Sequence, residues 1–120
     1  MNIHEISHNI IGMAMRVHSF FGPGFLEEVY KNALLVELEK SGLKYEKEAI
    51  LDINYKGTII GHYKADIIVE RKIIVELKSV NAIIPIHETQ LVHYLNATNI
   101  NDGLLLNFGS KSLQFKHKYK

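Results

Sequence analysis

Residues 66–78 read DIIVERKIIVELK, and this stretch decides the fold. Two apolar runs rich in Ile and Val flank a charged tripeptide, a pattern typical of two strands joined by a tight turn. Alternation of side chains gives each run one core face. Matching these faces in an antiparallel hairpin places Val69 opposite Ile73. Ile67 then lies opposite Val75.

The same register brings like charges together on the other face of the hairpin. Asp66 is expected directly opposite Glu76, and Lys64 then faces Lys78. Facing carboxylates destabilise a strand pair unless something offsets their repulsion. A divalent cation such as Mg²⁺ prefers these oxygen ligands, and Lys78 on the same face would orient or deprotonate a bound water. Alternatively, this face is exposed to solvent, and its Asp, Glu and Lys side chains screen one another.

The flanking segments predict an α+β protein with a mixed sheet and helices. Asn2 and Glu5 form a capping box before the first helical pattern, and Gly42 stands where a cap ends the second. Lys56-Gly57 predicts a turn, so three consecutive strands form an antiparallel meander. The expected helices span residues 3–19, 25–40 and 87–98, and the expected strands span 45–55, 59–69, 73–79, 104–108 and 112–118.

Length and composition predict one domain, residues 1–120, of the globular class. The chain has 47% apolar and 22% charged residues, near the averages for such proteins. It contains no Cys, which excludes disulfides, zinc–thiolate centres and thiol catalysis and fits a reducing compartment. No apolar run reaches the about 18 residues of a membrane helix, and the first residues do not resemble a secretory signal. We therefore expect a cytoplasmic protein with no membrane partner.

Positive charge is concentrated at the C-terminal end of the chain. The net charge is +1, yet residues 111–120 hold four lysines and no acid. Such a segment would contact the phosphates of a nucleic acid. Equally, lysines protect an exposed strand edge against pairing with other chains.

Polar residues outside the hairpin provide further candidates. Glu27 heads an apolar stripe on the second helix, which predicts a partly buried carboxylate; alternatively, it complements the positive end of that helix. Gln90 and Tyr94 lie four residues apart on the third helix, a pattern that is also typical of a helix surface. His62 alternates onto the strand face of Asp66, within reach of a bound phosphate.

Four motifs, in order, resemble those of a known family. Gly24–Tyr30 (GFLEEVY) resembles the signature of the GxxExxY proteins, a small-domain branch of the PD-(D/E)XK nuclease superfamily. Asp66, followed by Glu76–Lys78 (ELK), resembles the D…ExK core of the superfamily. Gln90–Tyr94 (QLVHY) resembles the QxxxY motif of its recombination-exonuclease branch. The resemblance covers nearly the whole chain, with one departure at Ala65, where the superfamily name has proline.

The resemblance implies a fold and an activity. The fold is a restriction-endonuclease-like αβββαβ core, with a central mixed sheet flanked by helices. The activity is hydrolysis of phosphodiester bonds, of DNA rather than RNA, with Mg²⁺ as cofactor and Mn²⁺ as a substitute. Such an enzyme would serve DNA repair, recombination or defence. The expected protein partners are a second copy in a homodimer, or a helicase or repair protein.

The resemblance also implies roles for individual residues. Asp66 and Glu76 would bind the metal together with the backbone carbonyl of Leu77. Glu27 would complete the acidic shell directly or through water, and Lys78 would position and activate the attacking water. The implied catalytic residues are Asp66, Glu76, Lys78 and Gln90, of which Gln90 would orient Lys78 or the nucleophile. The expected nucleic-acid contacts are Lys64, His62 and Tyr94. Tyr94 would either contact the DNA backbone or support Gln90.

Two other interpretations compete with that of an active nuclease. Residues 4–8 (HEISH) match the HExxH zinc-peptidase motif, but the motif stands at the start of the sequence, and Glu5 already has a capping role. Zinc that copurifies and is lost in His8→Ala would support it. The stronger alternative is a nuclease fold that binds nucleic acid or protein without cutting, since a fold can be kept while its chemistry is lost. Such binding would not need Glu76 or Lys78.

Overall fold

Three helices and five strands make up the chain, and the computed structural model describes all of its residues, 1–120. The sequence predicts each element in the observed order, with every boundary within two residues of the structure. No helix is both long and apolar enough to cross a membrane. The elements are α1 (Ile3–Phe21), α2 (Glu27–Ser41), β1 (Tyr45–Tyr55), β2 (Thr58–Val69), β3 (Ile73–Lys78), α3 (Pro85–Ala97), β4 (Asp102–Asn107) and β5 (Gln114–Tyr119).

Local signals explain where several elements begin and end. The predicted capping box opens α1, because Glu5 N donates to Asn2 Oδ1 at 2.9 Å while Asn2 N donates to Glu5 Oε1 at 3.3 Å. Gly42 ends α2 in the left-handed conformation, with φ of 81°, that favours glycine. The predicted Lys56-Gly57 turn joins β1 to β2, and both residues have positive φ, as two-residue hairpin turns require.

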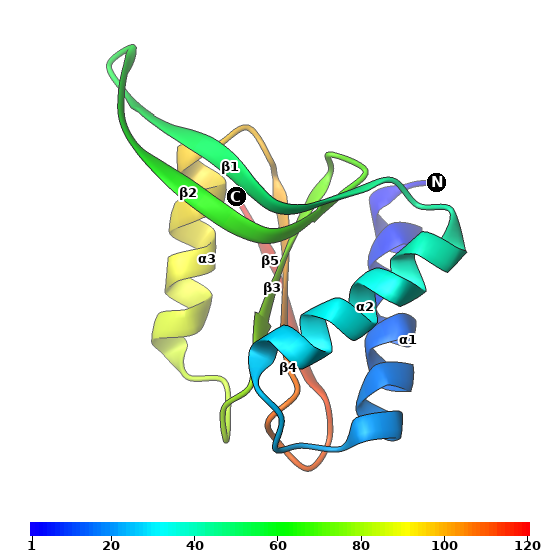
Figure 1. Cartoon of the computed structure of the whole chain (residues 1–120). Coiled ribbons are helices and arrows are strands. Elements are labelled where there is room, and N and C mark those ends of the chain that lie inside the picture. Colours follow the sequence, from blue (N-terminus) through cyan, green and yellow to red (C-terminus); the bar gives the residue numbers. More distant parts are fainter.

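All five strands form one mixed sheet in the order β1-β2-β3-β4-β5 (Figure 1). β1, β2 and β3 form the predicted antiparallel meander. α3 provides the crossover that lets β4 lie parallel to β3, and β5 returns antiparallel to β4. The fold is therefore α+β, as the sequence predicts.

The lysine-rich C-terminal segment forms β5, which is an edge strand of the sheet. Lys118 Nζ lies 3.0 Å from Glu88 Oε1 of α3. Lys120 Nζ donates to the Thr98 carbonyl at 3.2 Å. Two of the four lysines of this segment are therefore bound within the protein.

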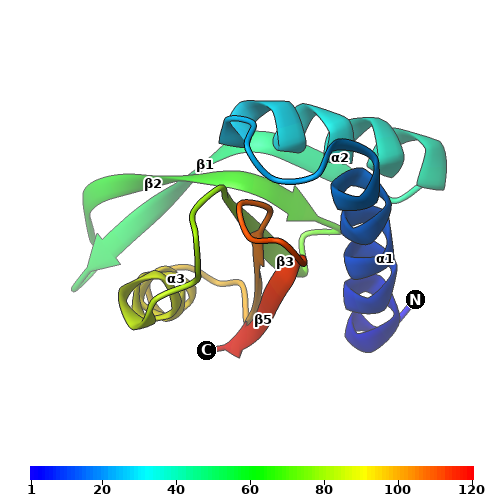
Figure 2. The ribbon, with the colours of Figure 1, turned by 90° about the horizontal axis from the view of Figure 1, so that it is seen from below.

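Helices cover both faces of the sheet (Figure 2): α1 and α2 lie on one face, and α3 lies on the other. Each face has its own apolar core. On β2, Ile67 and Val69 belong to the first core and Ile68 belongs to the second, and all three are fully buried. The expectation that this strand has a single core face is therefore wrong, because the helices bury both of its faces.

A buried amide ties the end of β4 to the segment that precedes α3. Asn107 is fully buried; its Oδ1 accepts from Val80 N and its Nδ2 donates to Val80 O, each at 3.0 Å. Asn107 Oδ1 also accepts from Gly109 N at 3.1 Å. Gly109 runs so close to Val80 that a Cβ at position 109 would collide with the backbone N and O of Val80. This close approach fixes the path of the chain into α3.

We predict that Gly109→Ala lowers the free energy of unfolding by about 1–3 kcal/mol, the usual cost of overpacking. Gly12→Ala is the matched control, because Gly12 lies within α1 and its added methyl would meet only Arg16 Nη1, at 4.0 Å. The control change should raise the free energy of unfolding by about 0.5–1 kcal/mol. Urea unfolding measures both variants, and a Gly109→Ala protein as stable as the wild type would contradict the close approach.

Candidate active site

Two carboxylates meet where the pairing of β2 with β3 stops. The pairing ends at Ile67 and Val75, in the predicted register. Asp66 N then donates to Glu76 Oε1 at 3.3 Å, and Leu77 N donates to Asp66 Oδ2 at 2.9 Å. Each side chain thus accepts a hydrogen bond from the backbone of the other strand. The hairpin therefore brings Asp66 and Glu76 together as the sequence predicts.

The two lysines expected to face each other do not pair. Lys64 pairs instead with Ile50 of β1, because the ladder between β2 and β3 does not extend beyond Ile67 and the two carboxylates occupy the next positions. Lys64 is exposed, whereas Lys78, the last residue of β3, is half-buried. The Lys78 amine makes no ion pair with any carboxylate.

A buried tyrosine orients Glu76 from the α3 side of the sheet. Tyr63 of β2 is 7% exposed and donates a hydrogen bond from its hydroxyl to Glu76 Oε1. Its ring stacks on Tyr94 of α3, with ring centroids 3.7 Å apart and ring planes 6° from parallel. Tyr94 therefore packs against the second core, whereas Gln90, one turn earlier on α3, is exposed.

Burial and charge make an ionised Glu76 costly. Burial first, and the negative charge of Asp66 second, raise the pKa of Glu76 to about 8, although the Tyr63 hydroxyl opposes this change. Burial also raises the pKa of Tyr63, and the charge of Glu76 adds to the effect. Tyr63 consequently stays protonated and remains a donor. A cation bound beside the two carboxylates would offset the cost of ionising Glu76.

A cavity of about 210 Å³ lies beside Asp66, next to the first turns of α2. Glu27, the first residue of α2, lines this cavity together with Asp66 and Leu77. Glu27 is exposed, so the prediction of a partly buried carboxylate is wrong, because the buried stripe of α2 begins only one turn later. The other lining residues are Glu28, Lys31 and Glu48.

An ion pair within this cavity was not expected from the sequence. Lys31 Nζ lies 3.1 Å from Glu48 Oε1; this contact raises the pKa of Lys31 and lowers the pKa of Glu48. Glu48 has φ of 50°, and the β1–β2 ladder skips Glu48 and Asp66. Lys31 stands one helical turn after Glu27, so helical spacing could have placed both on one face. No sequence signal marks the irregular backbone at Glu48.

Tyr63 was also missed by the sequence reasoning. Alternation along β2 predicts on which face of the sheet Tyr63 lies, but its hydrogen bond to Glu76 depends on the pairing of β2 with β3. Its second contact, with Tyr94, depends on how α3 packs on the sheet. A tyrosine three residues before an acidic position is the one signal that could have drawn attention to it.

The expected nucleic-acid contacts lie at different distances from the cavity. His62 Nδ1 lies 3.0 Å from Asp52 Oδ1, directly across the β1–β2 hairpin. His62 is therefore engaged away from Asp66. Lys64 does not line the cavity, but its charge helps to lower the pKa of Glu48, which does.

The donor set fits a hard divalent cation. Asp66, Glu76 and the Leu77 carbonyl are the oxygen donors that would bind such an ion, and Mg²⁺ commonly takes one or two carboxylates and keeps several waters. No three Asp, Glu or His side chains are grouped closely enough to hold a metal ion by themselves. Water and substrate oxygens would therefore complete the coordination shell. His4 and His8 of the HExxH match are exposed on α1, and no further ligand joins them.

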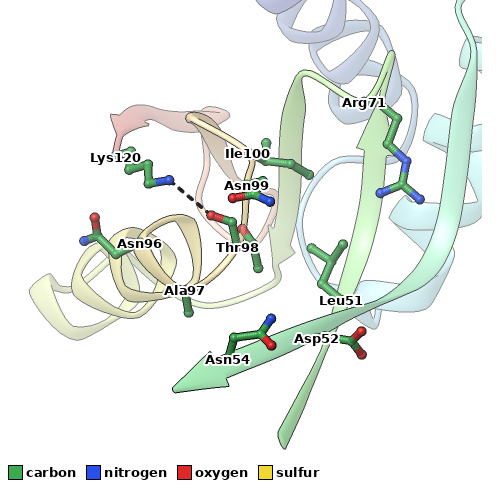
Figure 3. Close-up of a pocket in the computed structure, with 10 residues that line it drawn as sticks. All are labelled: Leu51, Asp52, Asn54, Arg71, Asn96, Ala97, Thr98, Asn99, Ile100 and Lys120. Carbon is green, nitrogen blue, oxygen red and sulfur yellow. Dashed lines mark hydrogen bonds between the residues drawn. The ribbon is translucent and has the colours of Figure 1, made fainter. Parts of the chain in front are cut away.

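Neither carboxylate of the acidic pair lines a larger cavity, of about 490 Å³ (Figure 3). Segments of β1 and the end of α3 line it, and none of the predicted site residues does. Asp52 is its only carboxylate, and the Lys120 amine is bound to the Thr98 carbonyl at 3.2 Å. The smaller cavity is the candidate active site, because four carboxylates line it, although Glu76 and Lys78 lie outside its lining.

The raised pKa of Glu76 predicts a pH dependence of stability in the absence of divalent cations. Between its ordinary pKa of 4.5 and about 8, folded Glu76 holds a proton that the unfolded chain has lost. Stability therefore falls as pH rises through this window. Each pKa unit corresponds to about 1.4 kcal/mol, so the loss should reach a few kcal/mol.

Urea unfolding at pH 5 and pH 8.5 would measure this loss. Glu76→Gln should remove most of the dependence, because the amide does not titrate. Glu39→Gln, at an exposed position on α2, should leave it unchanged. A Glu76→Gln profile parallel to that of the wild type would contradict the prediction.

Comparisons with known proteins give one match. The sequence model of the PD-(D/E)XK nuclease superfamily matches residues 4–119. A search of curated proteins gave no match. The matched range includes Glu27, the β2–β3 hairpin and α3. The narrower resemblance to the GxxExxY proteins stays a prediction.

Proposed function

Because the chain belongs to the PD-(D/E)XK nuclease superfamily, we propose that it is a Mg²⁺-dependent nuclease that hydrolyses the phosphodiester bonds of DNA. Its five-stranded mixed sheet flanked by three helices is consistent with a restriction-endonuclease-like core. One observation carries the proposal: Asp66 and Glu76 are joined across β2 and β3, and Lys78 follows on the same strand as Glu76.

The residues of the site divide the chemistry among them. Asp66 and Glu76 would hold the metal with the Leu77 carbonyl, and Glu27 would reach it from α2, directly or through water. A divalent cation bound there polarises a phosphate and lowers the pKa of a bound water. Lys78, whose amine has no carboxylate partner, would orient that water and stabilise negative charge on the phosphate.

Residues around the site would bind and orient the substrate. Gln90, exposed on α3, would orient Lys78 or the nucleophile when DNA is bound. Lys64 would contact a phosphate beside the cavity, and His62 would contact the backbone farther along the β1–β2 hairpin. Salt would weaken these phosphate contacts, as it does for other proteins that neutralise nucleic acid.

We place this nuclease in the cytoplasm, as one domain spanning residues 1–120, in DNA repair, recombination or defence. Specific protein–DNA interfaces usually bury more than about 1,000 Å² of protein surface. A chain of 120 residues has little surface to spare for this purpose. A second copy, or a helicase or repair protein, would supply the additional contacts.

Cleavage of circular double-stranded and single-stranded DNA with Mg²⁺ or Mn²⁺ tests the proposal. We expect wild-type cleavage to be abolished in Glu76→Ala, because the metal loses a ligand. Lys78→Ala should slow cleavage by about 100-fold to 10,000-fold, the usual contribution of a positioned proton-transfer group. Lys40→Ala is the matched control, since Lys40 is exposed at the end of α2, and it should cleave as the wild type does.

Each outcome distinguishes one interpretation. Equal cleavage by all four proteins would indicate a contaminating nuclease and contradict the proposal. Absent cleavage, with DNA bound equally by the wild type and Glu76→Ala, would support the module that binds without cutting. Parallel reactions with RNA of the same sequence would contradict the preference for DNA if RNA were cut faster.

A further inference from the structure

We propose that Tyr63 and Tyr94 form a stacked pair that positions Glu76 for metal binding, so that Tyr94 acts through Tyr63 and does not contact nucleic acid. The inference rests on the proposed metal site. It assigns a role to Tyr63, which lies in none of the sequence motifs. It also replaces the expected role of Tyr94 with a different one.

The protein donates hydrogen bonds to only one of the two carboxylate oxygens of Glu76. Tyr63 Oη and Asp66 N both donate to Oε1 of Glu76. Oε2 receives no hydrogen bond from the protein. The two donors thus hold the carboxylate in one orientation beside the Asp66 carboxyl group, which also contacts it, and no donor occupies Oε2. Residues that orient metal ligands in this way commonly change metal affinity when they are replaced.

The position of the Tyr63 hydroxyl depends on the ring to which it is attached. Tyr63 is almost entirely buried, and one face of its ring lies flat on Tyr94 at a centroid distance of 3.7 Å. Leu91 and Leu95, on either side of Tyr94 along α3, are 2% and 0% exposed in the second core. The helix that carries Tyr94 is therefore anchored on the sheet face opposite α2 (Figure 2). Packing of Tyr94 against the ring face holds the Tyr63 side chain in one χ1 rotamer and so fixes its hydroxyl at Glu76.

Tyr94 itself contributes a ring face and no hydrogen bond. Its side chain is half-buried, and its hydroxyl has no partner in the protein. A direct contact with a DNA phosphate would need that hydroxyl, whereas support of Tyr63 needs only the ring. The two roles therefore make opposite predictions for Tyr94→Phe, which removes the hydroxyl and keeps the ring.

Titration calorimetry of the full chain with Mn²⁺, at one pH, tests the positioning role. We expect Tyr63→Phe to weaken Mn²⁺ binding by about 10-fold to 100-fold, the range for residues that orient a ligand. Tyr94→Leu should weaken Mn²⁺ binding to a similar extent, whereas Tyr94→Phe should bind Mn²⁺ with the affinity of the wild type. Tyr45→Phe is the matched control, because Tyr45 also donates to a carboxylate, that of Glu39 at 2.8 Å, outside the site.

A double variant separates positioning from a general loss of stability. If Tyr94 acts through Tyr63, Tyr63→Phe combined with Tyr94→Leu should bind Mn²⁺ no more weakly than the weaker single variant. A purely structural role would lower the melting temperature of the variants and leave the Mn²⁺ affinity of the folded protein unchanged, which would overturn the inference. DNA binding that is weakened by Tyr94→Phe, with Mn²⁺ affinity retained, would overturn the part concerning Tyr94.

Glu76→Ala separates this inference from the proposed function. If Glu76→Ala loses Mn²⁺ binding and Tyr63→Phe retains it, the metal site stands and the positioning role is wrong. If Glu76→Ala binds Mn²⁺ as the wild type does, the proposed metal site is itself wrong. A wild-type protein that binds no Mn²⁺ would overturn both.

Discussion

Two carboxyl groups lie side by side where a strand pair ends, and the surrounding structure accommodates this constraint. Asp66 and Glu76 each accept a hydrogen bond from a backbone N–H of the opposite strand. These bonds join the two strands beyond the last paired residues, Ile67 and Val75. They stabilise the carboxylates without neutralising them, so ionising both groups at once still costs their mutual repulsion, and the pKa of Glu76 rises to about 8. A bound cation would relieve that repulsion without any change in the register of the hairpin.

The two helical layers approach the two carboxylates from opposite faces of the sheet. On one face, α3 supplies the aromatic ring behind Tyr63, which in turn donates to Glu76. On the other face, α2 supplies Glu27 and Lys31 to the cavity that Asp66 lines. β2 is buried on both faces between these layers. The acidic pair therefore lies between the two helical layers, with a different helix near each carboxylate.

Patterns that are local in the sequence predict the fold and the acidic pair. Alternation and turn chemistry specify the hairpin register, because both depend on neighbouring residues. The stack of Tyr63 on Tyr94 and the ion pair of Lys31 with Glu48 join distant segments, and no local pattern encodes them. Side-chain alternation also predicts the wrong partner for Lys64. The prediction assumes that the pairing of β2 with β3 continues beyond Asp66 and Glu76, whereas it ends just before them. The exposure of Glu27 was missed for a related reason: helical spacing identifies a face but not the turn at which the core begins.

The short connection between β2 and β3 also affects how the chain folds. Glu70 and Arg71 form a tight turn with positive φ, closed by a hydrogen bond from Lys72 N to Val69 O at 3.0 Å. Closing so short a loop costs little chain entropy, and isolated hairpins form within about 1–10 μs. The parallel pairing of β3 with β4 must wait for the longer crossover through α3. We therefore expect the two carboxylates to meet early in folding, before either helical layer supports them, so that their repulsion slows the first step of assembly.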